Sequence, residues 1–152
     1  MAYTNAEGAQ HLLDTLADAA DELGVALAYL GEAYEQLDES LADSLEAELF
    51  RPLQSAYGRA QRVHADFAAR RGLPEHPFQT PQPHVRDHDA KGIIESAVAA
   101  AERANGTLAT LQDSMLPVEV GDPPLRAGLE QVRVLLGDVR QRAREITRRL
   151  GR

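Results

Sequence analysis

The 152-residue chain has no cysteine, no tryptophan and only one lysine. Without cysteine it can form neither disulfides nor thiolate metal sites, and it has no cysteine nucleophile. No apolar run approaches the roughly 20 residues of a membrane-spanning helix. The first ten residues have neither the basic nor the apolar region of a secretion signal. We therefore expect a single domain (1–152) located in the cytoplasm, with no membrane association.

Positively charged side chains are also missing from the first third of the chain. Residues 1–50 contain twelve acidic residues and no lysine or arginine, whereas residues 123–152 contain eight arginines. With a net charge of −8, the chain lacks the dominant basic surface that nucleic-acid binding requires. Arginine outnumbers lysine fifteen to one, and this preference together with abundant alanine is typical of a GC-rich bacterial genome. The sequence thus indicates an acidic bacterial protein without a nucleic-acid partner.

What the sequence does contain is a sustained helical spacing of apolar residues. Leucine, alanine, valine and isoleucine recur every three or four residues over four long stretches, as in helices that share one core. The pattern predicts an all-α four-helix bundle. The expected helices cover about 5–39, 44–71, 89–115 and 123–150.

Capping and helix-breaking residues set the boundaries in the first half of the chain. Asn5 is the expected N-cap of the first helix, and Asp43 with Glu46 is the expected capping box of the second. Pro52 should either kink that second helix or restart its regular part. Gly72 should end it in a left-handed conformation.

In the second half of the chain, the start of the last helix is clear, whereas the continuity of the third helix is not. Asp122 followed by Pro123 is a strong helix start. Gly106 is a weak point in the third helix, where the spacing does not show whether the helix breaks.

The connection over 72–88 is long for a compact domain, and its four prolines should make it stiff and extended. We expect an antiparallel up-and-down bundle, in which the acidic first helix lies beside the arginine-rich last helix. A connection that spans the bundle would instead make the second and third helices parallel, and the spacing does not decide between the two. Close approach of these two helices is expected from five alanines, Ala56, Ala60, Ala97, Ala101 and Ala104.

The same connection carries the best candidate metal ligands. His84 and His88 are four residues apart, so on a helix they would lie on one face with Asp87 beside them. His76 or His64 could supply a third ligand for a divalent transition metal such as zinc. The alternative is a polar loop in which Asp87 or Asp89 caps the next helix and the histidines bind no metal.

Other chemistry finds no support in the sequence. Bundles of the di-iron class need inward-facing glutamates with Glu-x-x-His, a motif that occurs nowhere in this chain. There is no Gly-x-Ser-x-Gly element and no glycine-rich phosphate loop. We therefore expect no catalytic residues and no cofactor, apart from the metal considered above.

Aromatic residues beside the core positions of the second helix are candidates for an interface. Phe50, Tyr57 and His64 follow one another at seven-residue intervals, and Phe78 lies in the connection. They could pack on the chain's own connection or on a second subunit. We favour a non-enzymatic protein that acts by protein–protein interaction or scaffolding, as a homodimer or with another protein. The alternatives are a metal-binding bundle and a helical small-molecule sensor with its pocket between the second and third helices.

Overall fold

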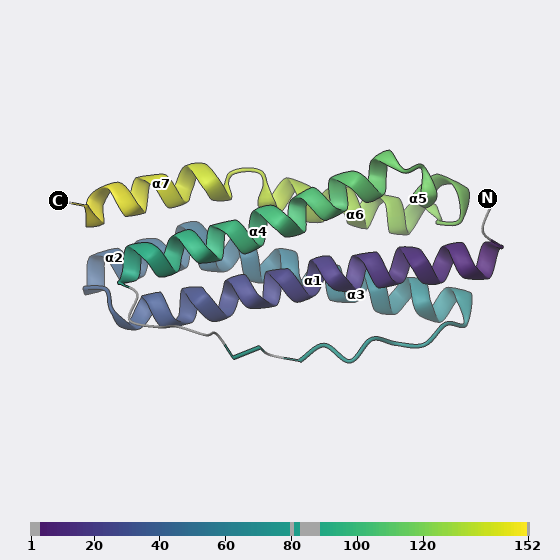
Figure 1. Cartoon of the computed structure of the whole chain (residues 1–152), viewed down its shortest axis with the longest axis horizontal. Helices are drawn as coiled ribbons and strands as arrows, with labels where there is room; N and C mark the ends of the chain where they lie inside the picture. Colours follow the sequence, from purple (N-terminus) through teal and green to yellow (C-terminus); the bar gives the residue numbers. More distant parts are fainter. Residues whose placement is uncertain (1–3, 80, 83–88, 152) are drawn as a thin grey trace.

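The computed structural model describes residues 4–79, 81–82 and 89–151. In these residues every regular element is helical, which confirms the expected all-α class (Figure 1). The elements are α1 (Asn5–Glu35), α2 (Glu39–Leu45), the π-helical turn η1 (Glu46–Phe50), α3 (Arg51–Arg71), α4 (Ala90–Asp113), α5 (Leu116–Glu119), α6 (Pro123–Leu136) and α7 (Val139–Leu150).

The direction of the helices differs from the antiparallel up-and-down order. In Figure 1, α1 runs from the N-terminus to the far end of the molecule, where α2 and η1 turn the chain back into α3. The segment 72–79 then returns along the molecule, and α4 starts near α2 and runs in the same direction as α3 (Figure 1). The expectation that consecutive helices alternate in direction is therefore wrong for this pair.

Packing between helices follows from this order. α1 packs most extensively on α4 and next on α3, whereas α6 packs on α3, and α7 on α4. The first and last helices are consequently not close neighbours, contrary to the expected pairing of acidic and basic helices. The expected contact between the second and third helices is also wrong, because α1 and α6 pack between them.

Small residues make the contact between α1 and α4 close. Both helices bury alanine on the shared side, and the distance between two helix axes depends on the size of the side chains at the contact. Larger side chains fill the remaining core, among them Leu16, Leu23, Phe67, Ile94 and Leu108, all fully buried. His64 is the one buried polar residue in the described part of the chain. No carboxylate is buried in that part of the chain.

The start and end of α1 are each shifted from the prediction. Thr4, not Asn5, is the N-cap: its hydroxyl accepts from the Glu7 N–H at 3.1 Å, and the Glu7 carboxylate accepts from the Thr4 N–H at 3.2 Å. α1 ends at Glu35 instead of 39, because Asp38 caps a new helix by accepting from the Leu41 N–H at 2.9 Å.

Asp43 and Glu46 do not form the predicted capping box, because the chain is already helical from Glu39 onward. Of the two effects expected of Pro52, the structure shows the restart: α3 begins at Arg51, directly after η1. Proline has no N–H to donate to the carbonyl of Glu48 four residues earlier. Arg142 of α7 instead donates to that carbonyl at 3.4 Å and forms an ion pair with the Glu48 carboxylate at 3.7 Å.

Three predicted boundary residues are confirmed. Gly72 ends α3 at φ 64°, with the Leu73 N–H bonded to Ala68 O at 2.8 Å in a Schellman arrangement. Asp89 caps α4 by accepting from the Gly92 N–H at 2.9 Å. Asp122 caps α6 by accepting from the Leu125 N–H at 3.0 Å.

In the second half of the chain the structure answers one question that the sequence left open and differs from one prediction. α4 continues through Gly106 and ends at Asp113, and Met115 then takes a left-handed conformation at φ 67°. The helix predicted over 123–150 is divided into α6 and α7 at Gly137 and Asp138. None of the described helices is long and apolar enough to cross a membrane.

Two contacts hold α6 against α3. Arg70 donates to both carboxylate oxygens of Asp122, at 2.7 and 2.9 Å. The hydrogen bonds from Arg70, and then that from the Leu125 N–H, hold the pKa of Asp122 below its usual value despite partial burial. The second contact lies further along both helices, where Val63 faces Gly128 so closely that a Cβ on Gly128 would overlap a Val63 methyl group.

This close approach predicts opposite effects for two glycine substitutions. Gly128→Ala should lower the free energy of unfolding by about 1–3 kcal/mol, because overpacking against Val63 outweighs the gain in helix propensity. Gly106→Ala is the matched control: it meets open space within α4 and should raise stability by about 1 kcal/mol. Urea unfolding measures both, and a Gly128→Ala variant as stable as Gly106→Ala would contradict the described contact.

Candidate functional site

The structure describes two of the five predicted metal ligands. His84, Asp87 and His88 lie outside the described residues. The two possible third ligands are described: His64 lies on α3 and His76 in the connection, with ring centroids 5.9 Å apart. Within residues 4–79, 81–82 and 89–151, no group of three histidine or carboxylate side chains is arranged to hold a metal ion.

His64 and His76 belong instead to an aromatic cluster in which side chains of the connection pack on side chains of α3. Phe78 packs edge-on against His64 at 5.6 Å between ring centroids, and against His76 at 4.6 Å. Tyr57 contacts Phe78 in the same way at 6.4 Å. We call Tyr57, His64, His76 and Phe78 the strap cluster, because they hold the connection on the bundle.

The strap cluster lies over the groove between α1 and α3. His76 Nε2 is 3.4 Å from a carboxylate oxygen of Asp21 on α1. A Cβ on Gly24 would stand 3.5 Å from both Pro81 and the Tyr57 ring, an ordinary contact distance, so the connection and Tyr57 both pack near α1 here. Packing of Tyr57 and His64 on the chain's own connection is one of the two roles left open by the sequence. A role for these residues in binding a second subunit stays a prediction.

His64 has an unusual electrostatic environment. Its side chain is only 3% exposed, and its Nδ1 is buried without a hydrogen-bond partner. Burial lowers the pKa of His64 below 6.5, and the neighbouring His76 lowers it further, against the opposite effect of Asp14, Asp21 and Glu75. The imidazole is therefore held neutral at neutral pH. A buried, neutral histidine that contacts the rings of His76 and Phe78 suits a packing role.

Phe50, the remaining predicted interface residue, lies elsewhere. It is half-buried and lines a hollow of about 280 Å³ where α1 ends beside η1. We call this the end hollow; its lining residues are Gly31, Tyr34, Glu35, Glu46 and Phe50.

Tyr34 in the end hollow was not predicted as an interface residue. The seven-residue apolar spacing Leu13, Ala20, Leu27, Tyr34 and Leu41 predicts a core position for Tyr34 in a first helix that reaches residue 39. Because α1 ends at Glu35, Tyr34 lies in the last turn and is 44% exposed. Gly31, three residues earlier, also lines the hollow, but apolar spacing alone does not distinguish Tyr34 from a core residue.

The chain shows no significant similarity to any family model, curated protein or solved structure. Its candidate sites therefore depend on the described geometry alone.

Acid should destabilise the protein through His64. The unfolded chain takes up a proton near pH 6.5, whereas the native state resists protonation, so unfolding becomes easier as pH falls below about 6.5. We expect the free energy of unfolding to decline between pH 7 and 5, and His64→Gln to remove much of that decline. His76→Gln is the control: it removes only the smaller effect of His76 on the pKa of His64 and keeps the burial, so it should keep most of the decline. The pKa of Asp122 lies below 3.8, so its own effect falls outside this window. Equal pH slopes for native protein and His64→Gln would contradict the assignment.

Proposed function

We propose that the chain is a non-enzymatic four-helix bundle protein that acts by protein–protein interaction, and that its partner is a second copy of itself. The observation that supports this most strongly is the end hollow, where the Tyr34 ring is exposed beside the half-buried Phe50. Aromatic residues in partly apolar hollows are typical centres of protein interfaces. The proposal places the homodimer in the cytoplasm and, given the net charge of −8, without nucleic acid.

Charge complementarity indicates what covers the end hollow. The carboxylates of Glu35 and Glu46 line it, and those of Glu32 and Glu39 are exposed nearby in the sequence. A surface of this kind favours a partner that combines apolar groups with arginine or lysine.

A second copy carries such groups on α7. Arg144 and Arg148 are exposed, and neither forms an ion pair within the part of the chain that the structure describes. α7 packs against η1 and α2, so these arginines lie at the same end of the molecule as the end hollow. A two-fold axis at this end would place each hollow against the α7 of the other copy, since a two-fold interface uses the same surfaces twice.

Light scattering tests the dimer with a matched pair of surface variants. Tyr34→Ser should weaken self-association at least about tenfold, the effect of losing a central aromatic residue. Val134→Ser is the control, because Val134 is 69% exposed on α6, outside the end hollow. A native protein that stays monomeric at high micromolar concentration would rule out the homodimer.

A charge exchange tests which surfaces meet. Glu35→Arg and Arg144→Glu/Arg148→Glu should each weaken self-association, because like charges would then face one another. Mixing the two variants should restore a dimer, since each contact then joins opposite charges. Mixed samples that stay monomeric while the native protein dimerises would show that the interface uses other surfaces.

A further inference from the structure

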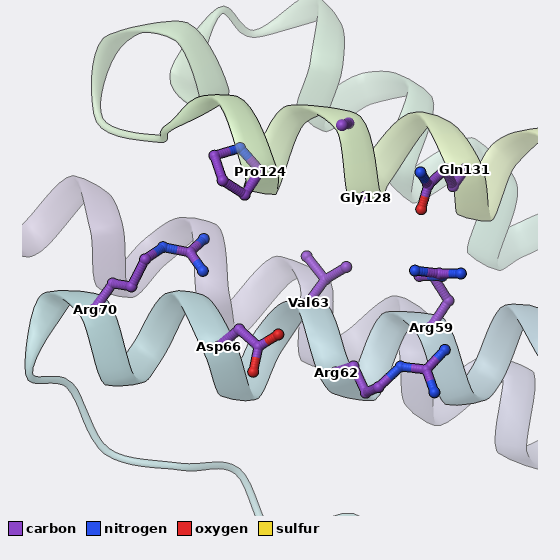
Figure 2. A pocket seen from close by; sticks show the side chains of 9 residues that line it. Arg59, Arg62, Val63, Asp66, Arg70, Pro124, Gly128 and Gln131 are labelled. Carbon is purple, nitrogen blue, oxygen red and sulfur yellow. The ribbon is translucent and has the colours of Figure 1, made fainter.

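A second concave site lies between α3 and α6, and none of the predicted sites includes it. Its volume is about 310 Å³. Figure 2 shows α3 and α6 facing one another across it, with Arg59, Arg62 and Arg70 on α3 and Pro124, Gly128 and Gln131 on α6. We call it the arginine pocket.

Positive charge in the arginine pocket exceeds negative charge. Arg70 is engaged with Asp122 through two hydrogen bonds. Arg59 and Arg62 are exposed and form no ion pair with any described residue. Asp66 is the one acidic residue in the lining. Arg59 and Arg62 are one helical turn apart, so their two guanidinium groups lie near one another on the surface of α3.

The opposite wall adds no charge that would neutralise these arginines. Gly128 has no side chain and meets Val63 at close range, which brings the two backbones together at the base of the pocket. Gln131 contributes an amide, and Figure 2 shows the Arg59 side chain rising from α3 toward it. The base of the pocket, formed by Val63 and Gly128, is therefore tight and apolar. The charged side chains of the lining all come from α3.

We propose that the arginine pocket binds a small phosphomonoester. Arg59 and Arg62 hold the phosphate group, because a guanidinium donates two parallel hydrogen bonds to a phosphate and two of them match the charge of a dianion. Asp66 accepts a hydrogen bond from a hydroxyl or amino group of the same ligand. The site involves α3 and α6 and none of the residues of the end hollow, so its occupancy does not require the dimer.

Titration calorimetry of the full chain tests the site, with inorganic phosphate and glycerol 2-phosphate as probes at constant ionic strength. Arg59→Gln/Arg62→Gln should weaken the binding of both probes at least about tenfold, the effect of losing charge-assisted hydrogen bonds. Asp66→Asn should weaken glycerol 2-phosphate more than inorganic phosphate. Arg51→Gln is the matched control, an exposed arginine on the same helix outside the pocket.

Three results would overturn the proposal. The first is a native protein that binds neither probe at millimolar concentration. The second is an equal loss in Arg51→Gln and in the double variant, which would reflect general attraction of anions. The third is that the native protein binds acetate, a monoanion, as tightly as it binds phosphate. Amide shifts of Gly128 and Gln131 on adding phosphate, absent in the double variant, would support the location directly.

Discussion

The contact of α1 with both α3 and α4 is the constraint on which the rest of the structure depends. α3 and α4 each run opposite to α1, so they must run in the same direction as one another. A chain that leaves one end of α3 can then enter α4 only after returning along the bundle, about 30 Å for a helix of 21 residues. Residues 72–88 are enough, because 17 extended residues span up to about 55 Å. The long proline-rich connection is therefore a consequence of how α1 is packed.

The same constraint arranges the surfaces. The returning connection covers the groove of α1 and α3, and this is why His64 is buried among Tyr57, His76 and Phe78. It leaves the other side of α3 free to meet α6, where the arginine pocket forms. The turn at the far end leaves Tyr34 exposed beside Phe50. Packing of the histidine, binding of an anion and association of two copies would thus use three separate surfaces of one bundle.

Apolar spacing and capping residues predicted the fold class and several helix boundaries. Helical spacing gave the all-α class, and capping and backbone chemistry identified Gly72 and Asp122 as helix boundaries. They left open whether Asp87 or Asp89 caps the third helix, and whether Pro52 kinks or restarts the second. The order of neighbouring helices could not be read, because apolar spacing identifies a buried face but not the helix that covers it. Tyr34 and the arginine pocket were missed for related reasons. The exposure of Tyr34 depends on where α1 ends, and the pocket depends on two helices that are far apart in the sequence.

The relative direction of α3 and α4 is the most direct test of this account, and the lack of native cysteine makes it simple to measure. Spin labels can be placed at three exposed sites: Ala69→Cys near the end of α3, and Lys91→Cys or Asp113→Cys at the two ends of α4. The 22 residues between the two α4 sites correspond to about 33 Å. If α3 and α4 run in the same direction, pulsed electron paramagnetic resonance should give a much shorter label-to-label distance from Ala69→Cys to Asp113→Cys than to Lys91→Cys. The reverse order of distances would show antiparallel α3 and α4 and contradict the fold described.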